Sequence, residues 1–154
     1  ATGLDALSHC IETFLSPRDN PPAEAIAQDG AGRIWRNLVR ACDEGTDLAA
    51  RREMMMGALE GGLSFQKGLG AIHSLSHPVG AIYDTHHGMT NAVVMPPVLR
   101  FNRPAIEAKI GLAAAYLGIS GGFDGFYDYV LKLREELGVP DKLSALGARI
   151  RRMQ

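Results

Sequence analysis

The sequence predicts an all-α protein. Apolar residues recur at helical spacing in successive segments of the 154-residue chain, and short stretches rich in proline, glycine and aspartate separate these segments. No segment shows a convincing strand pattern or an internal repeat, and residues 92–95 are the one weak strand candidate. We therefore expect one helical domain over residues 1–154. Because both ends of the chain fall within helical patterns, we also expect a fragment of a longer protein that is truncated at both ends.

Two helices are expected within residues 1–42. The first extends from about residue 3 to residue 15, with Thr2 as its N-cap. A break rich in proline, aspartate and asparagine follows, and the second helix extends over residues 23–42, with Trp35 as a large apolar anchor. The residues expected to face inward from this second helix are Ile26, Ile34, Leu38 and Val39.

The third expected helix contains an unusual number of glycines. It begins at residue 48 after a cap at Thr46 or Asp47, and it ends at about residue 66. Each glycine lowers helix propensity by about 1 kcal/mol relative to alanine. Such a cost is tolerated where a helix or a ligand must approach the backbone closely, so we expect close approaches at Gly57, Gly61 and Gly62.

Prolines divide the next part of the chain. Residues 68–81 are expected to form a short helix that Pro78 interrupts. After a turn, Thr85 is the expected N-cap of a helix over residues 88–100, which the prolines at residues 96–97 bend or break.

The last third of the chain is predicted to contain three helices. The first covers residues 104–117 with Pro104 at its first position, and the second covers residues 123–137 and ends at Gly138. Asp141 is the expected cap of the final helix. The apolar face of the second of these helices is formed by Phe126, Tyr129, Val130, Leu133 and Leu137.

Composition excludes several classes of function. The net charge is −1 and no block of basic residues stands out, which argues against nucleic-acid binding through a charged face. No apolar run reaches the roughly 18 residues that span a bilayer, so no membrane association is expected. Two cysteines do not make a disulfide framework, and a reduced, cytoplasmic setting is expected.

The histidines and one aspartate are the candidate functional residues. Four of the five histidines lie within residues 73–87, and the fifth, His9, follows Asp5 by four residues. Residues four apart on a helix lie on the same face, about 6 Å apart along the axis, so Asp5 and His9 could share a divalent cation. His73 and His77 repeat this spacing, which is typical of helical metal sites.

Spacing alone leaves other interpretations open. An aspartate and a histidine four apart also occur as a surface or capping pair, and paired helical histidines also occur as core residues bonded to backbone carbonyls. His87, at a helix start, could be a simple cap. As metal ligands, imidazoles and one carboxylate without a thiolate suit Fe²⁺, Zn²⁺, Mn²⁺, Co²⁺ or Ni²⁺, and they argue against a cysteine-type structural zinc site.

Two stretches together carry a resemblance to a known family. GLDALSHCIE at residues 3–12 and GLGAIHSLSHPVGAIYDTHHGMTNAVVMPPVLRFN at residues 68–102 resemble the C-terminal helical domain of the iron-containing (group III) alcohol dehydrogenases. The resemblance covers nearly the whole chain. It implies a multi-helix metal-binding domain of the type shared with dehydroquinate synthase-like proteins, without the N-terminal α/β nucleotide-binding domain.

The resemblance implies roles for individual residues. In the family one aspartate and three histidines hold the metal, and the matching positions here are Asp5, His9, His73 and His87. His77 matches a residue near substrate and nicotinamide, so it is the expected proton relay and cofactor contact. His86 stands where the family often has proline, and its role is left open.

The implied activity is hydride transfer between an alcohol or carbonyl substrate and NAD or NADP, with Fe²⁺ (Zn²⁺ as the alternative) polarising the substrate oxygen. Substrates in the family are small alcohols and aldehydes, and a homo-oligomer is expected. The family binds its dinucleotide mainly through a glycine-rich turn of the N-terminal domain. The GISGG sequence at residues 118–122 follows no strand pattern and is expected to be a plain loop, so this chain alone is expected to be weakly active or inactive.

Two alternatives remain at the level of sequence. The first is a non-catalytic helical module in which the four ligands serve structure alone. The second is a metallohydrolase, which is disfavoured because no glutamate base is evident beside the ligands, although Glu12 lies one helical turn from His9. An exchangeable ligand position and nicotinamide-linked turnover would distinguish the dehydrogenase from both.

Overall fold

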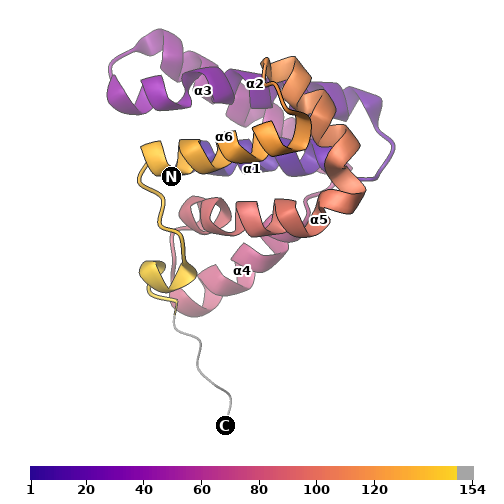
Figure 1. The fold of residues 1–154 in the computed structure, drawn as a ribbon. Coiled ribbons are helices and arrows are strands. Elements are labelled where there is room, and N and C mark those ends of the chain that lie inside the picture. The colour runs from indigo at the N-terminus through magenta and orange to yellow at the C-terminus, as the bar shows by residue number, and fades with distance from the viewer. Residues whose placement is uncertain (149–154) are drawn as a thin grey trace.

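The computed structural model describes residues 1–148, which form helices joined by short connections (Figure 1). No strand occurs among these residues, so the all-α prediction is confirmed. The elements in chain order are α1 (Thr2–Leu15), α2 (Pro21–Asp43), α3 (Leu48–Leu63), the 3-10 helix η1 (Ser64–Lys67), α4 (Ala71–Tyr83), α5 (His87–Leu117), α6 (Gly122–Glu136) and the 3-10 helix η2 (Leu143–Leu146).

Helix α1 is the central element, because it contacts α2, α3, η1 and α5 (Figure 1). Its apolar stripe of Leu4, Leu7 and Ile11 is buried in the core. The predicted anchor Trp35 on α2 is also buried, and its ring stacks on the rings of Tyr129 and Phe126 of α6 at centroid distances of 4.0 and 5.5 Å. The inward face predicted for α6 is therefore confirmed, and it closes the core against α2.

Glycines allow α3 to lie close to its neighbours. A Cβ atom on Gly57 would lie 2.6 Å from Cγ1 of Ile34 and 2.8 Å from the carbonyl oxygen of Gly30 on α2. A Cβ atom on Gly61 would lie 3.1 Å from Sγ of Cys10 on α1. The expectation of close approach is confirmed at these two glycines but is wrong at Gly62, where a Cβ atom would meet nothing within 4 Å.

Several predicted caps are wrong. Thr2 lies inside α1, whose N-cap is Ala1; the Ala1 carbonyl accepts from the Leu4 and Asp5 amides. Thr85 does not cap α5, because its hydroxyl is engaged by Thr90. Helix α3 is capped by Asp47, whose carboxylate accepts from the amides of residues 49 and 50 at 3.0 Å.

The prolines end no helix: the interruption predicted at Pro78 and the new helix predicted at Pro104 are wrong, and of the bend or break predicted at residues 96–97 the break is wrong. Helix α4 continues through Pro78, and α5 continues through residues 96–97 and Pro104, so that two expected helices form one of 31 residues. A proline removes one amide donor and can bend a helix without ending it, and the two parts of α5 run in different directions in Figure 1. The stretch from Ala92 to Leu99 is mostly buried, and this burial offsets the lost hydrogen bonds.

The end of the described chain is less helical than predicted. The final element is the short helix η2, preceded by Lys142, and Asp141 does not cap it. Residues 149–154, which continued the predicted helical pattern, lie outside the described residues. Within residues 1–148 no helix combines the length and apolar character needed to cross a membrane, and both cysteine thiols are free.

Candidate metal centre

Three helices bring the predicted ligands together. Asp5 and His9 lie one turn apart on α1, His73 lies on the first turn of α4, and His87 is the first residue of α5. Each of the four offers one carboxylate oxygen or ring nitrogen, and these atoms all lie within 4.8 Å of one another. The convergence is a property of the structure, whereas the role of these residues as metal ligands remains a prediction.

The Asp5 carboxylate is the common partner of the three imidazoles. Its Oδ1 atom lies 3.4 Å from Nε2 of His87, 3.6 Å from Nε2 of His9 and 3.7 Å from Nε2 of His73. The rings of His9 and His73 stack with their centroids 4.6 Å apart. The same edge of each ring therefore faces one small volume beside the carboxylate.

Electrostatics keep most of these groups in the protonation state that a ligand needs. Burial raises the pKa of Asp5, but the neighbouring imidazole of His73 and the charge of His9 lower it to below its ordinary value. Burial lowers the pKa values of His9 and His87; the charge of Asp5 opposes this shift, and positive neighbours add to it, so that both values lie below the ordinary one. Near neutral pH Asp5 is therefore an anion and both histidines are neutral, with lone pairs available to a cation.

His73 differs because two carboxylates face it. Burial lowers its pKa, but the hydrogen bonds and charges of Asp5 and Glu12 raise it to about 9. A divalent ion bound at Nε2 would take the place of the proton there.

Asn91 lies where the proposed ligand atoms of the cluster converge. Its side chain is fully buried, and Nδ2 lies 2.7 Å from Oδ1 of Asp5 and 3.1 Å from Nε2 of both His73 and His87. The Oδ1 atom of Asn91 is buried without a hydrogen-bond partner. One carboxylate and three imidazoles whose lone pairs meet at a single position fit a divalent transition-metal ion.

Glu12 and Asn91 are site residues that the sequence analysis did not identify as such. The Glu12 carboxylate contacts the outer ring nitrogen of His73, Nδ1, at 2.5 Å. The spacing contained a usable signal, because Glu12 follows Asp5 by seven residues and Asn91 follows His87 by four, so each lies on the ligand face of its helix.

The remaining predicted residues lie around the cluster. His77 is exposed, and its ring centroid lies 5.3 Å from that of His87 and 5.7 Å from that of His73. Phe65 packs edge-on against His9 with ring centroids 4.6 Å apart. His86 is exposed at the N-cap of α5 and outside the group of four.

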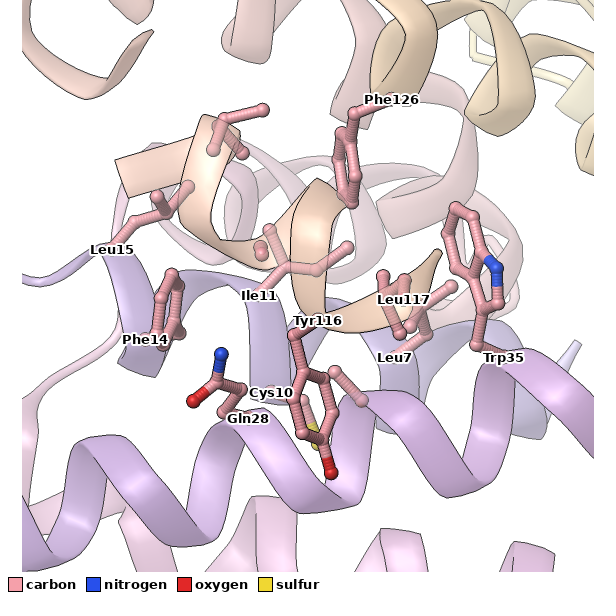
Figure 2. A pocket seen from close by; sticks show the side chains of 13 residues that line it. Leu7, Cys10, Ile11, Phe14, Leu15, Gln28, Trp35, Tyr116, Leu117 and Phe126 are labelled. Atoms are coloured by element: carbon pink, nitrogen blue, oxygen red, sulfur yellow. The ribbon is translucent and has the colours of Figure 1, made fainter. Parts of the chain in front are cut away.

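An apolar cavity of about 20 Å³ lies elsewhere, between α1, α2, α5 and α6 (Figure 2). Figure 2 shows Phe14, Trp35 and Phe126 among its walls, and none of the histidines contributes to it. A cavity this small and apolar is a packing gap in the core. The histidine cluster is therefore the candidate functional site.

Comparison with known proteins agrees with this geometry. The sequence pattern of the "Fe-containing alcohol dehydrogenase family, C-terminal" matches residues 1–153. The chain belongs to the iron-containing alcohol dehydrogenase family. Its fold is the C-terminal helical domain of that family, as the resemblance implied.

Relatives in this family are dehydrogenases. The chain is 54% identical over 110 residues to 4-hydroxybutyrate dehydrogenase of Cupriavidus necator, covering 68% of this chain and 29% of the relative. It is 34% identical over 157 residues to 1,3-propanediol dehydrogenase of Citrobacter freundii, covering 97% of this chain and 41% of the relative. This member of the family therefore spans well under half the length of these relatives.

Solved structures in the family have the same fold. A crystal structure of 1,3-propanediol oxidoreductase superposes with a TM-score of 0.90 at 34% identity, covering 96% of this chain and 41% of that one. Sulfoacetaldehyde reductase from Bifidobacterium kashiwanohense, solved in complex with NAD⁺, superposes with a TM-score of 0.87 at 25% identity, covering 97% and 40% of the two chains.

Proposed function

We propose that residues 1–154 are the metal- and substrate-binding domain of an NAD(P)-linked alcohol dehydrogenase, which reduces aldehydes in the reverse direction. The observation that carries the proposal is the convergence of one carboxylate oxygen and three imidazole nitrogens within 4.8 Å, contributed by three different helices. Membership of the iron-containing alcohol dehydrogenase family supports it.

The proposed ligands are Asp5, His9, His73 and His87, and the proposed ion is Fe²⁺, with Zn²⁺ as the alternative. When bound, such an ion supplies a Lewis acid that polarises the oxygen of an alcohol or carbonyl substrate. Asp5 contributes the negative charge of the site. Buried Asn91 contacts Nε2 of His73 and His87, and the ring of Phe65 packs edge-on against His9.

His77 is the proposed proton relay and nicotinamide contact. Oxidation of an alcohol sends a hydride to NAD(P)⁺ and releases the hydroxyl proton, which a neutral imidazole can accept. The His77 ring stacks against His87 and is exposed, so it lies beside the proposed metal site and is open to solvent.

Substrate and cofactor are proposed from the relatives. The 54% identity to 4-hydroxybutyrate dehydrogenase makes 4-hydroxybutyrate the first alcohol to test, and 1,3-propanediol is the second. NAD or NADP is proposed to bind mainly through a further α/β domain, in the part of the relatives' length that this chain does not span. Assembly into a homo-oligomer stays a prediction.

Elemental analysis tests the proposal, with wild type, His87→Ala and His86→Ala measured in parallel. His86 is the matched control, because it is the neighbouring histidine and lies outside the cluster. We expect a single iron or zinc ion per chain in the wild type and in His86→Ala, and its loss in His87→Ala. A wild-type chain that takes up neither Fe²⁺ nor Zn²⁺ under anaerobic conditions would contradict the proposal.

A further inference from the structure

Glu12 is a buried carboxylate placed directly behind the cluster. It lies on α1 on the same face as Asp5 and His9, and its side chain is only 5% exposed. A carboxylate is rarely buried to this degree unless hydrogen bonds satisfy both oxygens. Here each oxygen has a different partner on α4.

The first oxygen of Glu12 completes the beginning of α4. That helix has Gly70 at its N-cap, so no side chain of its own satisfies the first amides. The amide of Ile72 donates to Oε1 of Glu12 at 2.6 Å instead. A Cβ atom at position 70 would lie 2.9 Å from the same oxygen, so glycine leaves the room that the carboxylate occupies.

The second oxygen of Glu12 orients the imidazole of His73. An ionised carboxylate only accepts hydrogen bonds, so Nδ1 of His73 must be the donor in the 2.5 Å contact. With Nδ1 protonated, the lone pair of the ligand form of His73 is on Nε2, the atom that faces Asp5 and Asn91. The same carboxylate thus holds both the helix that carries His73 and the ring itself.

We propose that Glu12 is a positioning residue of the metal centre, which holds the ring of His73 with Nε2 toward the ion and increases metal affinity. The inference rests on the proposed function and deepens it. Carboxylates bonded to the outer nitrogen of a ligating histidine fix its tautomer and raise its basicity, and their loss weakens metal binding about 10- to 100-fold.

Glu12→Gln is the informative variant because it preserves shape. The two donors face different oxygens of Glu12, and the carboxamide replaces one of these oxygens with an NH2 donor, so in the same position it can accept from only one of Ile72 and His73. Glu24→Gln is the matched control, because Glu24 also joins separate elements by accepting hydrogen bonds but contacts two lysines away from the histidines. Zn²⁺ affinity of each chain is measured by competition with a chelator.

We expect Zn²⁺ to bind about 10- to 100-fold more weakly to Glu12→Gln than to the wild type, and with unchanged affinity to Glu24→Gln. Equal affinities in Glu12→Gln and wild type would overturn the inference and leave the proposed function standing. A wild-type chain that takes up neither Zn²⁺ nor Fe²⁺ would overturn the proposed function and this inference together.

NMR of the histidine side chains keeps the inference testable if Glu12→Gln does not fold. In the Zn²⁺-loaded wild type, we expect His73 to keep a hydrogen-bonded proton on Nδ1. Ligation of His73 through Nδ1, or a missing Nδ1 proton, would overturn the inference even if Zn²⁺ binds tightly. A purely structural cap at α4 would not predict this proton on Nδ1 of His73.

Discussion

At the scale of single residues, Asn91 and the expected ion compete for the same lone pairs. The Nδ2 atom of Asn91 lies within 3.1 Å of the proposed ligand atoms of Asp5, His73 and His87. An amide nitrogen and a cation cannot both use these lone pairs, so the carboxamide must turn or withdraw when an ion binds. The Oδ1 atom of Asn91 has no hydrogen-bond partner that would be lost when the carboxamide turns.

Titration with Zn²⁺ is therefore expected to shift the side-chain amide signals of Asn91 in a proton–nitrogen NMR spectrum. Asn37 is the internal control, because its amide donates to the carbonyl of Arg33 at 2.9 Å on α2. Its signals should not move. Unchanged Asn91 signals at saturating Zn²⁺ would show that the ion binds without involving this amide.

At the scale of elements, glycine sets the distance between α2 and α3. Gly57 lies against Gly30 and Ile34, whereas Gly62 on the same helix is exposed and has no neighbour within 4 Å of a Cβ position. Two glycines five positions apart are therefore expected to respond in opposite ways to the same substitution.

Gly57→Ala is expected to lower the free energy of unfolding, because overpacking costs about 1–3 kcal/mol and the approaching atoms include backbone. Gly62→Ala is expected to raise it by about 0.5–1 kcal/mol through helix propensity alone. Urea unfolding of the two variants beside the wild type measures both changes. A stabilising effect of Gly57→Ala would contradict the close packing of α2 and α3.

A second connection between elements is ionic. The Lys67 ammonium on η1 is fully buried, and both it and the half-exposed Lys109 of α5 donate to Oε2 of Glu24 at 2.6 Å and to the carbonyl of Phe14. Burial raises the pKa of Glu24, but the hydrogen bonds and charges of Lys109 and Lys67 lower it to below its ordinary value of 4.5. The carboxylate thus holds α2, η1 and α5 together.

This depressed pKa predicts how stability depends on pH. The contribution of Glu24 is present above the ordinary pKa of 4.5 and is lost as the pH falls through the lowered folded value. Glu24→Gln should therefore cost about 1–3 kcal/mol at pH 7, and this difference from wild type should shrink as the pH falls below 4.5. Urea unfolding of wild type and variant at pH 7 and at lower pH values measures this difference, with substitution of the exposed Glu135 (Glu135→Gln) as the control. A difference in unfolding free energy that does not change with pH would show that the ionised Glu24 carboxylate does not provide this stability.

At the scale of the whole molecule, the candidate centre joins parts of the chain that are far apart in sequence. Asn91 donates a hydrogen bond to Asp5, 86 positions away in the sequence, and the centre lies where α1, α4 and α5 meet. An ion bound there would link three helices in the folded state and could not be held in the same way by the unfolded chain.

Metal is therefore expected to stabilise the whole fold. A ligand at about 100 times its dissociation constant adds roughly 2.7 kcal/mol, which corresponds to a rise in Tm of about 5–10 °C for a chain of this size. Thermal unfolding with Zn²⁺ and then with excess chelator measures the rise and its reversal. The His87→Ala chain should show little rise, and an equal rise in that variant would place the stabilising ion elsewhere.

The amino-acid sequence by itself determined the helical class, most helix positions and the residues that meet at the centre. Helical periodicity is a local property of the sequence. The aspartate and the histidines belong to short motifs, so they can be recognised from the sequence alone. The caps at Thr2 and Thr85 were predicted wrongly, because nearby residues provide other partners. The Ala1 carbonyl accepts from the first amides of α1, and the Thr85 hydroxyl accepts from the Thr90 hydroxyl.

Only the tertiary structure decided how separate helices use one another. The continuation of α5 through its prolines depends on burial of its first half, and the roles of Glu12 and Asn91 depend on partners on other helices. Gly57 and Gly62 look alike in sequence and differ only because α2 passes one of them. Contacts of this kind depend on packing between distant segments, which no local pattern of residues encodes.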